Sequence, residues 1–194
     1  MRPALHFALY RLGLLPPETQ TSSAERACIV RHASGKTTAA EIGVWHGVTT
    51  CRIAESLKSS GVVYAIDNYL PGRLGVSFPY QVASWNTRRW RDRINFIRAT
   101  GTEAAAHLKE IPGPVFDFVF IDGDHSYRGL EADWEAWSPL LRSSGIVALH
   151  DSRSTASRNL ETAGSCIFTQ QIVARDKRFD IVEEVDTLTV LQRK

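Results

Sequence analysis

Short runs of apolar residues alternate along the chain with segments in which apolar residues recur every three or four positions. The first pattern predicts strands, and the second predicts amphipathic helices. From residue 39 to residue 150 the two kinds of segment take turns, as in proteins that have a parallel sheet with helical crossovers. The expected strands span residues 39–44, 62–67, 94–99, 116–122 and 145–150, and the expected helices between them span residues 49–59, 79–91, 103–111 and 127–141.

The end of the chain departs from this alternation. A helix is expected at residues 164–175, followed by strands at residues 179–185 and 188–192 that only Asp186 and Thr187 separate. Strands joined so closely form an antiparallel hairpin. The sequence therefore predicts an α/β fold with a doubly wound, Rossmann-like sheet. This sheet is mostly parallel, carries helices on both faces and ends at one edge in a C-terminal antiparallel hairpin strand.

Two helical segments precede the first strand. Ser22 and Glu25 have the spacing of a capping box, which predicts a helix that ends near Ser34. The segment 3–15 is amphipathic, and its short length and Arg11 argue against a membrane span. Its apolar residues share one face, which we expect to cover the core, the active site or a partner subunit, as in a homodimer. That face consists of Leu5, Ala8, Leu12 and Leu15.

The bulk properties fit one globular domain. The chain has 194 residues, of which 43% are hydrophobic and 23% are charged, so neither disorder nor a membrane protein is indicated. We expect a single domain over residues 1–194, with residues 1–20 as an N-terminal amphipathic helical extension and residues 37–192 as the Rossmann-like core. A net charge of +2 gives no argument for a nucleic-acid partner. Three widely separated cysteines predict reduced thiols in the cytoplasm and no disulfide framework.

A glycine turn connects the first strand of this core to the helix that follows it. Residues 41–47 read Glu-Ile-Gly-Val-Trp-His-Gly, and Gly43 and Gly47 permit a sharp turn with the backbone close to a ligand. The free N–H groups at the start of the next helix face that ligand. Asp67 ends the next strand, where a carboxylate is positioned to bind both ribose hydroxyls of a nucleoside. This pattern predicts a site for an adenosine-type cofactor.

The spacing of the glycines excludes two kinds of nucleotide site. The dinucleotide fingerprint G-x-G-x-x-G requires a glycine where Trp45 stands. A P-loop is excluded because the chain contains no G-x-x-x-x-G-K-[ST], and the Gly-Lys-Thr at residues 35–37 precedes the strand instead of following it. What remains is E-x-G-x-x-x-G with a downstream ribose carboxylate and no phosphate site.

The remaining pattern resembles motif I of the class I S-adenosylmethionine-dependent methyltransferases. The resemblance implies that Glu41 lies near the methionine portion of the cofactor, where a carboxylate suits an ammonium and a sulfonium. It also implies that Gly43 and Gly47 are the glycines of the motif, that Asp67 binds the ribose, and that adenine lies just past the third strand. The order of five parallel strands and a terminal hairpin is similar to that family over residues 22–192.

A second group of polar residues follows two neighbouring strands. Asp122, Asp124 and His125 come after the fourth parallel strand, and His150 and Asp151 come after the fifth. The ends of neighbouring strands lie ~5 Å apart at the edge where such sheets bind ligands, so these side chains can converge. Converging carboxylates repel each other unless a proton or a cation separates them, and Mg²⁺ prefers oxygen ligands. We expect a metal at Asp122, His150 and Asp151, where His150 suits Mn²⁺ or Co²⁺ better than Mg²⁺ or only orients Asp151.

These residues resemble those of the catechol-type and macrolide-sugar O-methyltransferases. In these enzymes an aspartate after strand four and an acidic pair after strand five hold a divalent cation. Asp122 and Asp151 match those positions, and His150 departs from the acidic pair. The Asp-Gly-Asp-His-Ser-Tyr at residues 122–127 is most similar to small bacterial methyltransferases, many of them attached to natural-product, glycolipid and saccharide pathways. Asp122 is also a candidate contact of the cofactor.

The resemblance implies methyl transfer to a hydroxyl oxygen by in-line displacement. We expect the cation to bind the acceptor oxygen, with Asp122 in the catalytic group, and His125 or Asp124 to take the proton. The expected acceptor is a small-molecule or oligosaccharide hydroxyl, as in a saccharide or a glycosylated metabolite.

The same residues leave alternatives to this function. A catechol-like aromatic hydroxyl would use the same ligands and bind in a narrower apolar slot, built from the N-terminal helix and the loop after Asp67. A non-catalytic module of the same fold would bind the cofactor without turnover. The missing glycine disfavours a nicotinamide oxidoreductase, and the absence of an N-P-P-[YF] motif disfavours nucleic-acid methylation.

Overall fold

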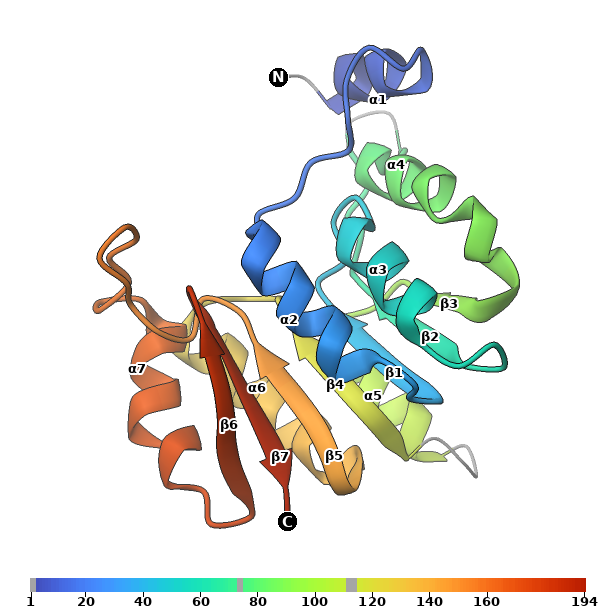
Figure 1. Ribbon diagram of the computed structural model, residues 1–194. Helices are drawn as coiled ribbons and strands as arrows, with labels where there is room; N and C mark the ends of the chain where they lie inside the picture. Colours follow the sequence, from blue (N-terminus) through green and yellow to red (C-terminus); the bar gives the residue numbers. More distant parts are fainter. Residues whose placement is uncertain (1–2, 73–74, 111–114) are drawn as a thin grey trace.

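The structure is a computed structural model that describes residues 3–72, 75–110 and 115–194. Its centre is a sheet of seven strands in the order β3-β2-β1-β4-β5-β7-β6 (Figure 1). The first five strands along the chain are parallel to one another, and β7 runs antiparallel to both of its neighbours. The strands are β1 (Thr38–Ile42), β2 (Val62–Ile66), β3 (Ile94–Ile97), β4 (Phe116–Ile121), β5 (Leu141–Leu149), β6 (Phe179–Val185) and β7 (Leu188–Arg193).

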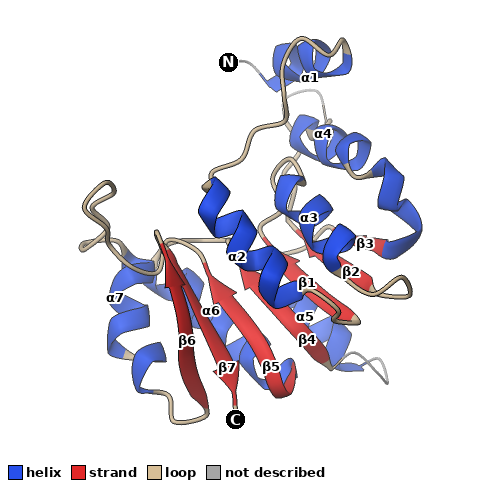
Figure 2. Ribbon diagram, viewed as in Figure 1, coloured by secondary structure: helices blue, strands red, loops and turns tan. Residues whose placement is uncertain are grey.

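Helices cover both faces of the sheet (Figure 2), so the predicted fold class is confirmed. One face carries α2 (Ser23–Ala33), α3 (Val48–Ser56) and α4 (Phe78–Asn86), and the other carries α5 (Gly101–Glu110), α6 (Tyr127–Trp137) and α7 (Gly164–Gln171). Short 3₁₀ turns occupy Arg88–Arg93, Ser138–Leu140 and Val173–Arg175. Within the described ranges, no helix has the length and apolar character needed to cross a membrane.

The central strand β4 shows how the sequence builds two cores. Phe118 and Phe120 point to the cluster under α2 and α3, whereas Val119 and Ile121 point to the cluster under α5 and α6. All four side chains are almost fully buried. An unbroken apolar run is therefore required in a strand that is covered on both faces.

The terminal hairpin forms as predicted, but its position in the sheet differs. The antiparallel strand β7 lies one place in from the edge, because β7 and not β6 pairs with β5. The residues of β7 from Leu188 to Leu191 are buried, whereas Ile181 and Val182 of β6 are 46% and 44% exposed. The more apolar strand takes the inner position because burial of apolar surface stabilises it there.

The N-terminal helix differs most from its prediction. α1 (Pro3–Arg11) is shorter than the expected 3–15, because Gly13 has a φ of 72° and ends the helix. It lies beside α4 (Figure 1), where Phe7 contacts Phe78 with ring centroids 5.9 Å apart. Leu5 and Leu12 of the predicted apolar face are 52% and 72% exposed. The expectation that this face covers the core or the active site is therefore wrong, and its contact with a partner subunit stays a prediction.

Other element boundaries differ by a few residues. α6 ends at Trp137 instead of residue 141, because Pro139 follows and the chain tightens into a 3₁₀ turn. β5 consequently begins at Leu141, four residues earlier than expected. The predicted end of the fifth helix at residue 111 lies outside the described residues.

Candidate active site

A cavity of about 630 Å³ opens at the carboxyl ends of the parallel strands. This is the edge where open α/β sheets bind ligands. The turn after β1, the turn after β3 and the loop after β4 form its walls, and the segment between α1 and α2 adds residues 18–20. The predicted site residues that line this cavity are Glu41, Gly43, Asp67, Asp122, Asp124 and His125.

The turn after β1 has the backbone geometry that its glycines predict. Gly43 and Gly47 have φ values of 86° and 71°, in the region that favours glycine. A Cβ at Gly43 would lie 2.0 Å from the carbonyl oxygen of Asp122, so a glycine is needed where β1 and β4 end side by side. Gly47 caps the N-terminus of α3 and faces Thr87, outside the cavity wall.

Asp67 holds this turn in place. Its Oδ2 accepts hydrogen bonds from the backbone N–H groups of Val44 and Trp45 at 3.1 and 3.0 Å, and its Oδ1 accepts one from the Tyr69 N–H at 2.9 Å. A carboxylate oxygen has two lone pairs, so Oδ1, which accepts one of these bonds, can accept a further bond from a ligand in the cavity. Asp67 can thus fix the turn and also bind a ribose hydroxyl.

Glu41 is a buried acidic group in the cavity wall. Its residue is 1% exposed, and the Thr50 hydroxyl on α3 donates a hydrogen bond to it. Burial raises the pKa of Glu41 well above its usual range, the Thr50 bond opposes this, and the charges of Asp122 and Asp67 raise it further. A cationic ligand would lower this pKa again, so the position favours a positively charged group.

Asp133 on α6 is a buried carboxylate that no sequence motif marks. It is 7% exposed and lies against Gly101 and Gly123, between the turns that follow β3 and β4. Burial, reinforced by the charge of Asp124, raises the pKa of Asp133 to about 6, and no hydrogen bond from a described residue reaches its carboxylate. Its place beside Leu130 on the core-facing side of α6 is the sequence signal that would have revealed it.

The two predicted bases differ in their surroundings. His125 lies between two carboxylates, with Nε2 3.5 Å from Asp122 Oδ1 and Nδ1 3.9 Å from Asp151 Oδ2, and its side chain is 37% exposed. The exposed Asp124 accepts a hydrogen bond from the Ser126 backbone N–H at 2.8 Å. Asp124 therefore has a local structural partner at the start of α6, whereas His125 faces the charged end of the sheet.

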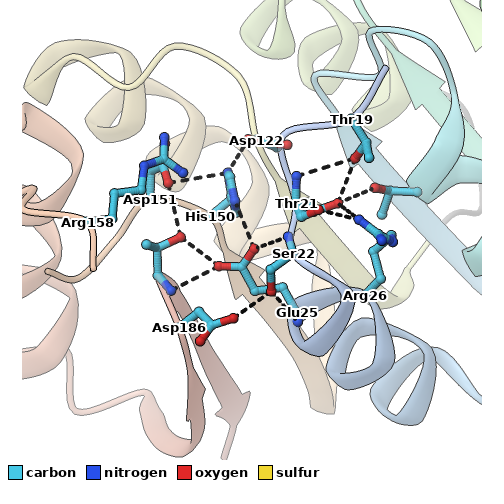
Figure 3. A network of polar contacts seen from close by, with 12 residues as sticks. Thr19, Thr21, Ser22, Glu25, Arg26, Asp122, His150, Asp151, Arg158 and Asp186 are labelled. Atoms are coloured by element: carbon cyan, nitrogen blue, oxygen red, sulfur yellow. Dashed lines mark hydrogen bonds and ion pairs between the residues drawn. The ribbon is translucent and has the colours of Figure 1, made fainter. Parts of the chain in front are cut away.

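His150 forms the centre of a buried polar network (Figure 3). Its Nδ1 is hydrogen-bonded to Asp122 Oδ1 at 2.8 Å, and its Nε2 forms an ion pair with Glu25 Oε2 at 3.3 Å. Burial lowers the pKa of His150, but the contacts with Asp122 and Glu25 outweigh burial and raise it to about 10. Burial has the opposite effect on Glu25 and raises its pKa, but the bonds from His150, the Ser22 N–H and Thr187 outweigh burial and lower it to about 2.

Asp151 is held by residues from two other segments. Its backbone has a φ of 50°, its residue is 5% exposed, and Arg158 forms an ion pair with its Oδ2 at 2.6 Å. The Thr187 hydroxyl, in the turn between β6 and β7, lies 3.0 Å from Asp151 and 2.7 Å from Glu25. The hairpin turn is thereby connected to the edge of the candidate site.

The predicted cation ligands do not fit a divalent cation in this arrangement. Each ring nitrogen of His150 faces a carboxylate, and Arg158 takes one oxygen of Asp151. Asp122, His125 and His150 each have one possible ligand atom within 4.8 Å of those of the other two. However, His150 Nδ1, the nitrogen nearest Asp122, is already hydrogen-bonded to Asp122 Oδ1. His150 and Asp151 are also not among the residues that line the cavity.

Sequence reasoning found Glu41, Asp67, Asp122 and Asp124 in the cavity wall, but it missed Asp133 there and three members of the polar network around His150 and Asp151. Glu25 was expected only as part of a capping box, which is present, and it also contacts His150. Arg158 and Thr187 come from irregular segments that carry no motif. Their role depends on how the hairpin and the loop after β5 return to the sheet edge, which local sequence does not encode.

Comparisons with known proteins agree with this geometry. A sequence model of the family described as a methyltransferase domain matches residues 40–152. The O-methyltransferase from Bacillus cereus, solved in complex with SAH, is 18% identical, with a TM-score of 0.70 over 99% of this chain and 90% of that chain. TomG from Streptomyces achromogenes, an O-methyltransferase involved in tomaymycin synthesis and solved with SAM, is 13% identical, with a TM-score of 0.69 over 100% and 90% of the two chains. No curated protein matches the sequence.

The family match spans more than half of the chain and contains both predicted motifs. The chain therefore belongs to this family of methyltransferase domains, as the resemblance predicts. Its fold is that of the class I S-adenosylmethionine-dependent methyltransferases, which the structural likenesses establish independently of sequence identity.

The buried network predicts a pH-dependent loss of stability on replacing His150. The variant His150→Gln leaves Glu25 and Asp122 facing each other without the positive charge, so it should lower the free energy of unfolding by about 3 kcal/mol near pH 6. The folded-state pKa of His150 lies above its ordinary 6.5, so its contribution is full below pH 6.5 and is lost as the pH rises toward 10. Urea unfolding at several pH values measures this difference.

The matched control is His107→Gln on the exposed face of α5, which should change stability little at any pH. A difference between wild type and His150→Gln that stays constant from pH 6 to pH 10 would contradict a charged His150.

Proposed function

We propose that this protein is an S-adenosylmethionine-dependent O-methyltransferase whose acceptor is a hydroxyl of a saccharide or glycosylated metabolite. The observation that carries the proposal is the cavity at the sheet edge, which brings the acidic groups of motif I together with His125. Membership of a methyltransferase domain family supports the reaction class. The names of the similar structures, which describe O-methyltransferases, support transfer to oxygen.

The cavity suits the cofactor in its charge distribution. Glu41 offers a carboxyl to the ammonium and sulfonium, and Asp67 offers the free lone pair of Oδ1 to a ribose hydroxyl. We assign the adenine to the space between the turns at Gly101 and Gly123, where the Asp133 carboxylate accepts no hydrogen bond from any described residue. An ionised Asp133 would accept a hydrogen bond from the exocyclic amino group of the base.

His125 is the proposed general base. The acceptor hydroxyl gives its proton to a ring nitrogen of His125 while its oxygen attacks the methyl carbon. The carbon–sulfur bond breaks, and the sulfonium leaves as the neutral thioether S-adenosylhomocysteine. The imidazolium that forms would be stabilised by Asp122 and Asp151, whose carboxylates lie 3.5 and 3.9 Å from its two nitrogens.

The segment between α1 and α2 favours a saccharide over a catechol-like acceptor. An aromatic acceptor would be expected in an apolar slot, but this segment contributes Glu18, Thr19 and Gln20 to the cavity wall. Polar side chains with several donors and acceptors match a ligand rich in hydroxyl groups. The alternative of a non-catalytic module does not account for a histidine held between two carboxylates at the cavity wall.

Replacing His125 should separate catalysis from cofactor binding. The variant His125→Ala should lower turnover about 100-fold or more on a saccharide acceptor, because a general base contributes at least that factor. Its affinity for S-adenosylhomocysteine should stay within a factor of about two of the wild type, because a base that acts only on the acceptor contributes little to binding of the cofactor product. Transfer of a labelled methyl group and calorimetry measure the two quantities. His107→Ala is the control, and equal turnover of His125→Ala and wild type would remove His125 from the mechanism.

Replacing Asp133 should alter recognition of the adenine. Asp133→Asn should weaken binding of S-adenosylhomocysteine at least about tenfold, because the amino group then faces a neutral amide in place of a charged acceptor. S-inosylhomocysteine carries a carbonyl oxygen in place of that amino group, so the variant should lose no affinity for it. Glu131→Gln on the same helix is the control for loss of charge. If Asp133→Asn weakens both ligands equally, Asp133 does not contact the amino group.

A further inference from the structure

Three carboxylates converge on the buried ring of His150. Asp122 lies 2.8 Å from Nδ1, Glu25 lies 3.3 Å from Nε2, and Asp151 lies 3.7 Å from Nδ1. Nδ1 is within hydrogen-bond distance of Asp122, and Nε2 forms an ion pair with Glu25; in each contact a hydrogen on the nitrogen removes the repulsion between two lone pairs. With a hydrogen on both nitrogens the ring is a cation and has no lone pair for a metal.

Asp151, the third of these carboxylates, also has partners on both of its oxygens. The Arg158 guanidinium lies 2.6 Å from Asp151 Oδ2, and the Thr187 hydroxyl lies 3.0 Å from Asp151 Oδ1. A divalent cation on Asp151 would have to approach a fixed positive charge. The side chain of Asp151 is 6% exposed and that of His150 is 0% exposed, so water screens the charges of these two residues little, whereas the side chain of Arg158 is 42% exposed.

We propose that two protein cations, His150 and Arg158, take the place of the divalent cation in this site. They neutralise the carboxylates at the ends of β4 and β5 and hold them rigidly, and one negative charge of the cluster is left without a matching protein cation. That charge faces His125, so it favours the imidazolium that forms when His125 takes the acceptor proton. The effect on the His125 imidazolium rests on the proposed function. The replacement of a divalent cation by His150 and Arg158 does not.

A metal-binding alternative has a definite geometry. If His150 carried a hydrogen only on Nε2, toward Glu25, its Nδ1 lone pair could join Asp122 and His125 around a cation, because these three ligand atoms lie within 4.8 Å of one another. Glu25 would then act as the carboxylate that orients a metal-bound histidine. The two arrangements differ in the protonation of one nitrogen and in affinity for a metal, and both are measurable without an acceptor.

The first measurement is Mn²⁺ binding, read as loss of the free-ion signal in electron paramagnetic resonance. Protein treated with EDTA and desalted is titrated to millimolar Mn²⁺, with and without S-adenosylhomocysteine. The expected result is no binding at this site. Stoichiometric binding that His150→Gln abolishes would overturn the proposal. Calorimetry of S-adenosylhomocysteine on the same samples tests the proposed function separately, because cofactor binding does not depend on this outcome.

The second measurement is Mn²⁺ binding to a variant in which a metal site has been introduced. The double variant His150→Glu with Arg158→Ala restores an acidic pair and frees Asp151, so it should bind Mn²⁺. Its matched partner, His150→Glu with Arg153→Ala, keeps Arg158 on Asp151 and should bind at least about tenfold more weakly. Equal binding by the two variants would contradict the role of Arg158. Arg153 is a suitable control because it pairs with Glu184 instead.

The third readout is the protonation of His150 in the wild-type protein, and the His150→Gln variant serves only to assign the signal. Nitrogen-15 NMR of labelled histidine, assigned by the peak missing in His150→Gln, should show hydrogens on both ring nitrogens of His150 at neutral pH. A single protonated nitrogen would overturn the proposal.

Discussion

The interaction on which the site depends is the burial of His150 between Glu25 and Asp122. A buried charge is tolerated only when its partners are fixed around it, so this contact constrains where α2, β4 and β5 can lie. Thr187 extends the constraint to the hairpin, because it reaches Glu25 and Asp151 together. The inner position of β7 brings that turn to the sheet edge. The network thus holds distant segments around one end of the cavity.

The charge of the cavity provides a reason for its choice of ligand. Glu41, Asp67 and Asp122 line it, and burial disfavours the charged form of Glu41 unless a cation is present. S-adenosylmethionine carries both an ammonium and a sulfonium, whereas its product has lost the sulfonium charge. On the proposed function, the same acidic wall therefore binds the substrate form more strongly than the product and assists release after transfer.

Local patterns predicted the fold and the cavity wall, but not the polar network. Alternating apolar segments predicted the succession of strands and helices along the chain, and Gly43 and Asp67 marked the cofactor turn, because their backbone and position requirements are local. The exposed stripe of Leu5 and Leu12 was misjudged, since helical periodicity does not reveal which face meets the protein. Asp133 and Arg158 were missed because their roles arise from tertiary contacts, in which a loop or helix face meets a distant strand end.

The central claim is that the acidic cavity is a cofactor site that is complete without a divalent cation. Calorimetric titration of the EDTA-treated protein with S-adenosylhomocysteine tests it most directly, with NADH as the competing nucleotide. We predict one site of micromolar affinity that added Mg²⁺ leaves unchanged, and no binding of NADH. Absence of S-adenosylhomocysteine binding, or binding that appears only after Mg²⁺ is added, would contradict the account.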